Sequence, residues 1–471
     1  MNDPQRPIYV DGTWHLYYLY NADYPDGNGT EWYHATSDDL VHWHNEGVAI
    51  EKYRNGLGDI LTGSAVVDEE GTAGFGRGAV VALVTQQDDG VQRQSLFGST
   101  DGGYTFQPYA GNPVMENPGV VDWRDPKIIR DEASGRWVMA LAEGSRLGFY
   151  TSADLISWTY TSDFVSDALG LLEGPDLFEM VDPATGRRTW ILAASADGRA
   201  EGRTTGLAYW TGSWDGVRFT ADDPAPQWLD DGADFYAAVT WEDPARPGAA
   251  RLTERSALGW INNWAYARDL PTRDWQGGTL SVTRSISLTE VDGRLRLRSR
   301  PVDALRALEG DAVVASAHDI APGAIAPLAV QPSSPAYRMR VSFARPDTGE
   351  LRLRLGDDGA HAVTVGYDAD RGAAFIVRDD TVAATFPAVY RAVQTDPAAD
   401  ADRAGRRATQ EIVTMDVLVD ASSVEVFLND GSSLTSAMYP VDTATVTAET
   451  VGAPFRIEDL SLAPMATAIT D

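Results

Sequence analysis

The stretch TSDDLVHW at residues 36–43 returns as TSADLISW at residues 151–158. Looser copies are STDGGYTF at residues 99–106 and GSWDGVRF at residues 212–219. Each copy closes on an aromatic residue, and these aromatic residues are 63, 52 and 61 positions apart. A four-stranded antiparallel sheet with its turns takes about that length, so the period indicates the blades of a β-propeller. Chance repetition of turn residues is the alternative interpretation.

Short apolar runs bounded by Gly, Asp, Asn and Pro fill the chain, and helical periodicity is scarce. We therefore predict an all-β protein. Strand-like sequence continues from residue 234 to 288, which suggests a five-bladed β-propeller over residues 1–300. Aromatic residues thin out near residue 300, and longer alternating strands follow from Tyr337 onward. This second pattern predicts a C-terminal β-sandwich over residues 301–471.

The composition restricts the partners of the protein. Its 471 residues carry 38 basic and 69 acidic side chains, which gives a net charge of −31 and a pI near 4.4. Such a field repels phosphate backbones and anionic membranes, so we expect no nucleic-acid partner and no membrane association. A neutral substrate meets no such barrier. The absence of cysteine excludes disulfides and a cysteine nucleophile, and no run reaches the roughly 18 apolar residues of a membrane span.

No charged and apolar leader precedes Met1, so no signal peptide is visible in this sequence. Either the protein is cytoplasmic or an upstream stretch has been removed. We expect the second of these, an extracellular protein with a truncated N-terminus. Asp3 then lies two residues from the chain end, where chains commonly fray, and we expect it to be poorly held.

Three acidic residues begin blade-like units instead of lying in their outer turns: Asp3, Asp125 and Glu173. Because the first strand of each blade lines the channel of a propeller, these side chains are expected to converge. Three carboxylates in one pocket push their pKa values apart and leave one protonated near neutrality. Glycoside hydrolysis needs such a set. Taken singly, the tripeptides around these residues are also ordinary turn signals.

Apolar walls for such a pocket are expected from Trp32, Trp260 and Trp264. We expect no metal site, because His42 and His44 alternate on a strand and have no obvious third ligand. No Gly-x-Ser-x-Gly elbow is present, so serine hydrolase chemistry has no support.

The ordered motifs resemble glycoside hydrolase family 32, the β-fructosidases. The family signatures Asn-Asp-Pro, Arg-Asp-Pro and Glu-Cys-Pro-Asp are similar to residues 2–4, 124–126 and 173–176. Further stretches that resemble the family are residues 32–43, 63–68, 234–238, 259–264 and 423–427. Each tripeptide is weak alone, but the ordered set is highly specific and runs from residue 2 to about 440. The resemblance implies a five-bladed propeller with a C-terminal sandwich, in agreement with the repeats.

By this resemblance Asp3 would be the nucleophile that attacks the anomeric carbon of a fructosyl unit. Glu173 would protonate the leaving oxygen and then deprotonate the incoming water or hydroxyl. Asp125 would bind fructose hydroxyls and stabilise the transition state, with Arg124 orienting it. Because the family retains the anomeric configuration, the Asp3 and Glu173 carboxyls should lie about 5–5.5 Å apart. No metal and no organic cofactor is implied.

Other residues are expected to hold the substrate, a fructan or fructo-oligosaccharide. The expected substrate-binding residues are Asn2, Trp32, Thr62, Arg124, Asp234 and Trp260. We further expect a monomer or a weak homo-oligomer, in which the sandwich braces the propeller.

Several residues depart from the family pattern. Gly174 stands where the family has Cys, Gln5 follows the first signature in place of Asn, and Leu19 replaces a Gln that is expected to bond sugar. The changes at Gln5 and Leu19 resemble levan fructotransferases. Residues 259–264 and 275–278 instead resemble exo-inulinases and levanases, so the branch stays open.

The leading hypothesis is a retaining β-fructan hydrolase that favours levan-type β-2,6 polymers over inulin and releases fructose or a short fructo-oligosaccharide. The closest rival uses the same carboxylates, but a hydroxyl of the bound difructosyl unit attacks and a cyclic difructose anhydride forms. The third hypothesis, of another class, is a non-catalytic carbohydrate-binding propeller, because residues 99–106 resemble the turn motif of sialidases and some lectins.

Overall fold

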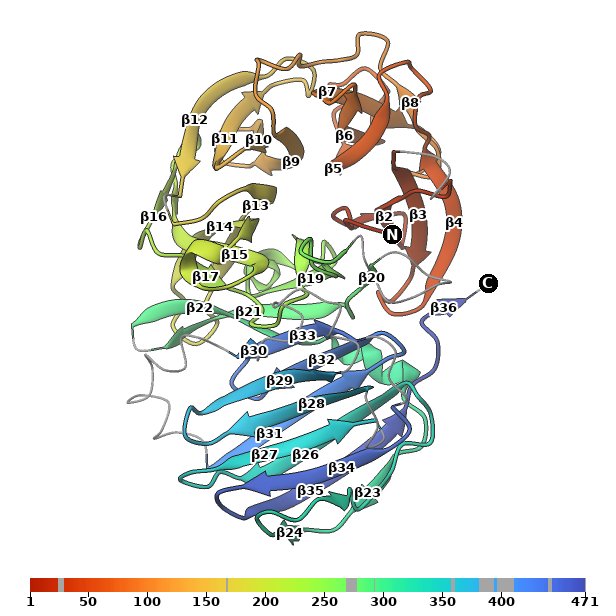
Figure 1. Ribbon diagram of the computed structural model, residues 1–471. Coiled ribbons are helices and arrows are strands. Elements are labelled where there is room, and N and C mark those ends of the chain that lie inside the picture. Colours follow the sequence, from red (N-terminus) through yellow and green to blue (C-terminus); the bar gives the residue numbers. More distant parts are fainter. Residues whose placement is uncertain are drawn as a thin grey trace.

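The protein consists of a ring of β-sheets that rests on a flatter pair of sheets, as Figure 1 shows. The computed structural model describes residues 1–23, 29–166, 168–267, 278–291, 293–356, 361–380, 394–395, 411–438 and 443–470. The helices among them are three short 3-10 turns: η1 (Arg199–Glu201), η2 (Gly248–Leu252) and η3 (Asp303–Leu308). The all-β prediction is confirmed. In these ranges, no helix is long and apolar enough to cross a membrane.

The ring is built from antiparallel sheets whose strands follow one another along the chain, except that β36 pairs parallel with β4 in the first sheet. The first sheet contains β1 (Ile8–Val10), β2 (Thr13–Tyr20), β3 (Glu31–Ser37), β4 (Trp43–Ile50) and β36 (Ile469–Thr470). The next contains β5 (Asp59–Asp68), β6 (Ala79–Asp88), β7 (Val91–Ser99) and β8 (Gln107–Pro108). It is followed by β9 (Trp123–Asp131), β10 (Arg136–Glu143), β11 (Arg146–Ser152) and β12 (Thr159–Val165). The remaining strands of the ring are β13 (Leu172–Val181), β14 (Arg188–Asp197), β15 (Thr205–Trp214), β16 (Phe219–Ala221) and β17 (Gln227–Trp228), then β18 (Tyr236–Trp241), β19 (Glu254–Ile261), β20 (Thr279–Leu280), β21 (Arg284–Val291) and β22 (Arg294–Pro301).

Apolar clusters fill the spaces between consecutive sheets and close the ring. The closure joins the last sheet to the first, where Trp14 and Leu16 of β2 pack with Trp241 of β18 and Leu258 of β19. Similar clusters lie between each earlier pair of neighbouring sheets. Burial of apolar surface between the sheets therefore holds this propeller together.

The repeated stretches of the sequence form the turn between the third and fourth strands of a sheet. Between β3 and β4, the Ser37 hydroxyl and the Asp39 carboxylate accept hydrogen bonds from backbone N–H groups of the turn at 2.9 and 2.8 Å. Between β11 and β12, Ser152 and Asp154 accept the corresponding bonds at 2.9 and 2.7 Å. The repeat therefore reflects one turn chemistry at one place in the sheets.

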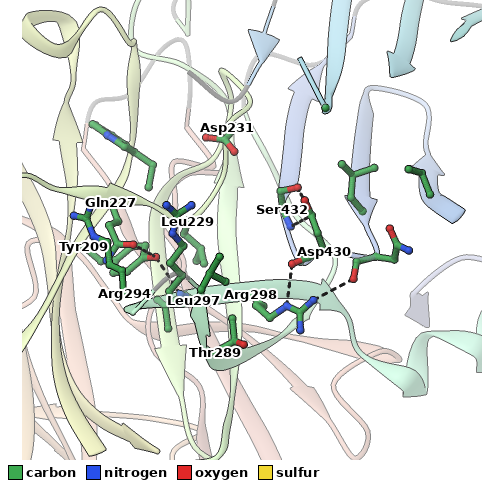
Figure 2. A pocket seen from close by; sticks show the side chains of 18 of the residues that line it. Tyr209, Gln227, Leu229, Asp231, Thr289, Arg294, Leu297, Arg298, Asp430 and Ser432 are labelled. Carbon is green, nitrogen blue, oxygen red and sulfur yellow. Dashed lines mark hydrogen bonds between the residues drawn. The ribbon is translucent and has the colours of Figure 1, made fainter. Parts of the chain in front are cut away.

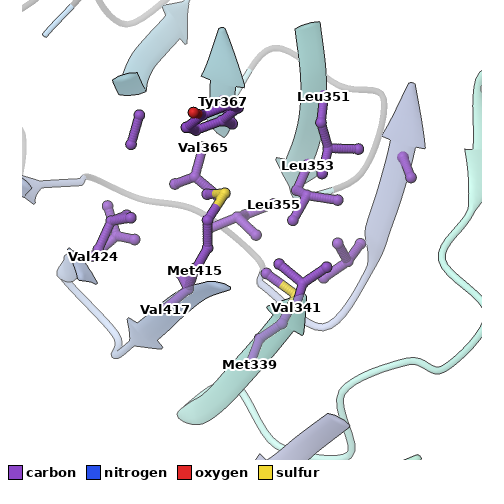
Figure 3. Packing of buried hydrophobic residues seen from close by; sticks show 14 of the residues in the cluster. Met339, Val341, Leu351, Leu353, Leu355, Val365, Tyr367, Met415, Val417 and Val424 are labelled. Carbon is purple, nitrogen blue, oxygen red and sulfur yellow. The ribbon is translucent and has the colours of Figure 1, made fainter. Parts of the chain in front are cut away.

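The second region is a β-sandwich. One sheet contains β23 (Val313–Ala315), β24 (His318–Ile320), β26 (Tyr337–Ala344), β31 (Ile412–Val419), β32 (Ser423–Leu428), β33 (Ser433–Ala437) and β35 (Phe455–Pro464). The other contains β25 (Ala326–Pro327), β27 (Glu350–Leu355), β28 (His361–Asp368), β29 (Ala373–Asp380), β30 (Gln394–Thr395) and β34 (Val446–Val451). Alternate residues of the facing strands, such as Met339 and Leu353, fill the core between the sheets (Figure 3).

A buried guanidinium joins the sandwich to the propeller. Arg284 of β21 donates to Asp230 at 2.7 Å and to Glu425 of β32 at 2.6 Å, and its side chain is fully buried. Its guanidinium also stacks on Phe235 and on Phe427 at 4.0 and 5.0 Å from the ring centroids. A cation so placed is compensated only while both carboxylates stay in position.

We expect Arg284→Met to destabilise the protein by about 3–5 kcal/mol, because it leaves two buried carboxylates without their cation. The measurement is the midpoint of urea unfolding followed by tryptophan fluorescence. Adding Glu425→Gln to the variant removes one of those charges and should recover part of the loss. An unchanged midpoint for Arg284→Met would contradict the role of this side chain.

Candidate active site

The inner strands of the ring carry β-bulges near their N-terminal ends. Register shifts occur in β5, β9, β13 and β18. Three bulge residues have a left-handed backbone: Asp125 at φ 64°, Gly174 at φ 50° and Ala237 at φ 46°. A bulge interrupts the alternation of side chains and re-aims them. Pro126 and Pro175 are tolerated there because a bulge does not need their missing N–H.

Asp3 lies beside β2, and its main chain is hydrogen-bonded there. Its carbonyl oxygen accepts from the Leu19 N–H and from the Gln5 amide, both at 3.0 Å. Its own N–H donates to the Asn2 side chain at 2.8 Å, and its Oδ2 accepts from the Thr62 hydroxyl at 2.7 Å. The expectation that Asp3 is poorly held is therefore wrong, because Leu19 of β2 holds its backbone and Thr62 of β5 holds its carboxylate.

Asp125 lies in the bulge of β9 and is 5% exposed. Its N–H donates to the Thr85 hydroxyl at 3.0 Å, and its Oδ2 accepts from the Gly174 N–H at 2.9 Å. The carboxylate thus bridges β9 and β13. A Cβ on Gly174 would meet no atom within 4 Å, so the missing Cys side chain leaves open space beside the bridge.

The Glu173 carboxylate accepts hydrogen bonds at both oxygens. Oε1 accepts from Arg124 at 2.9 and 3.1 Å, and Oε2 accepts from the Tyr236 hydroxyl at 2.5 Å. Arg124 also donates to Asp122 at 2.5 Å. Burial, reinforced by the charge of Glu173, raises the pKa of Tyr236 well above its ordinary value. The phenol therefore stays protonated and acts as the donor.

The sequence predicted that one of the three carboxyls would be protonated near neutrality, but two of them, Asp3 and Asp125, have raised pKa values. Burial raises the pKa of Asp3 to about 6, although the Thr62 hydrogen bond opposes the shift. Burial and the charge of Glu173 raise the pKa of Asp125 to about 7. The carboxyls poised near neutrality are thus the two that the resemblance assigns to an ionised nucleophile and a stabilising group. The guanidinium of Arg124 is the cation of the cluster.

Trp32 lies in the core between two sheets and not in the cluster. Its side chain is 0% exposed, its ring stacks on Tyr17 at 5.4 Å, and its indole N–H donates to the Leu61 carbonyl at 3.0 Å. A ring without exposed surface cannot contact a sugar in this conformation, so the substrate-binding prediction for Trp32 is not supported. Its contact with Leu61 instead supports the strand that carries Thr62.

Asp234 faces the sandwich. Its carboxylate accepts from Arg378 of β29 at 2.7 Å, from the Ala437 N–H at 2.8 Å and from the Tyr266 hydroxyl. It is 0% exposed. The prediction of sugar binding by Asp234 is therefore corrected to a contact between the two regions, because the carboxylate is fully buried and accepts from buried donors at both oxygens.

Trp260 is 2% exposed and packs with Tyr236 and Ala237. Its ring lies 4.9 Å from that of Trp264, which is 41% exposed. Trp264 is therefore the better candidate for an apolar wall. Of the stretch that resembles exo-inulinases, residues 275–277 lie outside the described residues.

Two residues of the cluster were not selected from the sequence. Tyr236 is the hydroxyl donor to Glu173, and the only signal for it was its place in the family-like stretch 234–238. Gln5 bridges the Asp3 carbonyl and the Gly63 N–H, the second at 2.8 Å. The sequence analysis singled out Gln5 as a departure from the family pattern, but it did not predict this bridging role.

One cavity of the described structure lies away from the carboxylates. A cavity of about 330 Å³ between the propeller and the sandwich is lined by Tyr209, Leu297, Arg298 and Asp430, among others (Figure 2). There, Arg298 donates to the Asp430 carbonyl at 2.9 Å. Within the part of the chain that the structure describes, no group of three or more His, Asp or Glu side chains is arranged to hold a metal ion.

Comparisons with known sequences agree with the order of the motifs. The profile of the glycosyl hydrolases family 32 N-terminal domain matches residues 1–301, and that of the family's C-terminal domain matches residues 305–461. The levanbiose-producing levanase of Bacillus subtilis is 44% identical over 438 residues, which cover 92% of this chain and 82% of that protein. The levanbiose-producing levanase of Geobacillus stearothermophilus is 47% identical over 382 residues, which cover 80% of this chain and 95% of that protein.

A solved structure has the same fold. The exo-inulinase from Aspergillus awamori superposes with a TM-score of 0.84, covering 99% of this chain and 96% of that chain. The two sequences are 24% identical, so this likeness concerns the fold.

We expect Asp125→Asn to raise the unfolding temperature at pH 8, by about 1–3 °C. The folded pKa of Asp125 lies near 7, above its value in the unfolded chain. Stability therefore falls as pH rises from about 4 to 7, and the cost of the buried charge is complete above pH 7. The gain should shrink as the pH is lowered toward 4. Thermal unfolding of the wild type and the variant between pH 4 and pH 8 measures the gain and its dependence on pH.

Asp176→Asn is the matched control, because it removes another buried carboxylate from the inner strands. Burial opposes the ionised form, but Lys127 and Arg255 hold the pKa of Asp176 below its usual value. The substitution should therefore destabilise the protein at pH 8. Equal signs for the two variants would contradict the electrostatics described above.

Proposed function

The chain belongs to glycoside hydrolase family 32, and from that premise we propose that it is a retaining β-fructan hydrolase that favours levan and releases levanbiose. The observation that carries the proposal is the cluster of Asp3, Asp125 and Glu173, whose carboxylates lie close enough for their charges to act on one another. Each is held by a neighbouring strand, and the set supplies the two carboxyl groups that retaining hydrolysis needs.

Glu173 is the proposed acid/base and Asp3 the proposed nucleophile. Glu173 gives a proton to the glycosidic oxygen while the bond from that oxygen to the anomeric carbon breaks, and an Asp3 oxygen bonds that carbon. In the second step, Glu173 takes a proton from water as the water oxygen attacks the same carbon. The bond to Asp3 then breaks and its carboxylate is restored. The Thr62 bond to Oδ2 supports Oδ1 as the attacking oxygen.

The remaining residues of the cluster orient these groups. Oδ1 of Asp125 is proposed to accept from a fructose hydroxyl, since Oδ2 is used by the Gly174 N–H. Arg124 holds Glu173 and offsets the charge of the three carboxylates. Asn2 and Thr62 position Asp3, so their proposed contribution to substrate binding is indirect.

We further propose that the sheets of the ring are the five blades suggested by the repeats, with the domain boundary after residue 300. The end of β22 at Pro301 supports this division. We also propose that the enzyme acts outside the cell, because a levan polymer is too large to cross a membrane.

The products of levan, inulin and sucrose, resolved by chromatography and mass over time, test the proposed activity. We expect levan to be consumed fastest and a difructose with the mass of levanbiose to appear first. Early free fructose would show that the enzyme releases one fructosyl unit at a time and not levanbiose, and it would still support hydrolysis. A difructose one water lighter would instead identify intramolecular transfer, and no turnover of any of the three would contradict the proposal.

We expect Glu173→Gln to lower kcat on levan by about 10²–10⁴-fold, because the amide can neither give nor take the proton. The unfolding temperature should stay close to that of the wild type. Glu143→Gln is the matched control, since Glu143 is also buried and accepts from a tyrosine, Tyr150, at 2.6 Å. The control should keep its turnover. Equal effects of the two substitutions would remove Glu173 from the acid/base role.

A further inference from the structure

The segment that leads into β18 is bound along the edge of the sandwich. The Asp231 N–H donates to the Ser433 carbonyl at 2.8 Å, and the Asp234 N–H donates to the Thr435 carbonyl at 3.2 Å. In return, the Thr435 N–H donates to the Asp230 carboxylate at 2.9 Å. Residues 230–234 therefore behave as an added edge on β33, and their backbone position is set by the sandwich.

The contact is fixed by a buried ion pair between Asp234 and Arg378. Nη1 of Arg378 donates to Asp234 at 2.7 Å, to the Tyr266 hydroxyl at 3.0 Å and to the Ala437 carbonyl at 3.1 Å. The side chains of Arg378 and Asp234 are 1% and 0% exposed. Such a pair contributes little net stability because both charges lose their hydration. Its geometry is strict, however, so the pair is suited to hold Asp234 and the segment that follows it in one orientation.

Tyr236 follows two residues after Asp234. Its hydroxyl donates to Glu173 at 2.5 Å, and the bulge at Ala237 begins directly after it. The tyrosine therefore lies between the last backbone contact with the sandwich and an interruption of its own sheet. Phe235, between the two, lies under the Arg284 guanidinium at 4.0 Å, which is a second contact to the interface.

We propose that the sandwich positions the acid/base carboxylate of the propeller. Arg378 and β33 fix Asp234, the short segment to β18 fixes Tyr236, and the Tyr236 hydroxyl orients Glu173. Arg378 and Tyr236 are positioning residues in this scheme. The inference rests on the proposed function, because it takes Glu173 as the acid/base, and it gives the sandwich a part in turnover beyond bracing the propeller.

Arg378→Gln is the variant that tests the connection. Misplacement of a catalytic group by about 1 Å can cost up to 10²-fold in rate, so we expect kcat on levan to fall by about ten- to hundredfold while KM stays within about twofold. The pH profile of kcat should also shift, because the Tyr236 bond to Glu173 loosens. Arg378→Lys should recover part of kcat, since an ammonium offers three donors where Nη1 now makes three contacts.

Arg338→Gln is the matched control. Arg338 is also a buried arginine of the sandwich, 6% exposed, and donates to Asp416 at 2.8 Å and to Glu309 at 2.9 Å. It lies on β26, which β31 and β32 separate from β33. Its substitution should lower the unfolding temperature and leave kcat and the pH profile unchanged.

A double variant tests whether Arg378 affects Glu173 through Tyr236. If Arg378 acts through Tyr236, Arg378→Gln should cost no further kcat in a Tyr236→Phe background. Additive losses in kcat would overturn the proposal, as would an Arg378→Gln protein that is less stable but keeps the wild-type kcat and pH profile. In both cases an active wild type leaves the proposed function intact. A wild type inactive on levan, inulin and sucrose overturns the proposed function and this inference with it.

Discussion

The inner strands of neighbouring sheets must be joined by side chains, because no ladder of backbone hydrogen bonds connects them in the described residues. Asp125 bridges β9 to β13, and Tyr236 of β18 reaches Glu173 of β13. Further along β9 and β13, a Lys127–Asp176 ion pair at 3.0 Å makes a similar link. The groups proposed to perform the chemistry are thus also the groups that hold the channel together. This double role explains why polar side chains are concentrated along strands that are otherwise apolar.

Burial raises the pKa of the carboxyls on these strands, but the neighbouring charges decide the direction of the net shift. Near their N-terminal ends carboxylates are in excess, and burial raises the pKa values of Asp3 and Asp125. Further along, Asp176 lies beside Lys127 and Arg255, and the two cations lower its pKa against the effect of burial. At the proposed site, the fold therefore contains carboxyl groups whose surroundings favour the protonated form. Elsewhere it compensates them with cations. Such a difference is typical of functional sites.

Local signals in the sequence were sufficient for the repeated turns, because Ser37 and Asp39 bond their own turn. The alternating strands of the sandwich were predicted for the same reason, since one face of each is buried. Asp234 could not be assigned, because its partner Arg378 lies 144 residues away and no local pattern joins them. The burial of Trp32 likewise depends on a neighbouring sheet. No glycine or proline in the sequence marks the bulge at Ala237. The contact of Tyr236 with Glu173 could therefore not be predicted and was found only in the structure.

The parallel pairing of β36 with β4 has a consequence for biosynthesis. Strands β1 to β4 are synthesised before the other strands, but β36, which covers the outer edge of their sheet, emerges only after the strands of the sandwich. Until then, β4 presents an unpaired edge to the solvent. The sheet that holds Asp3 is therefore finished last, after the strands of the sandwich have left the exit tunnel.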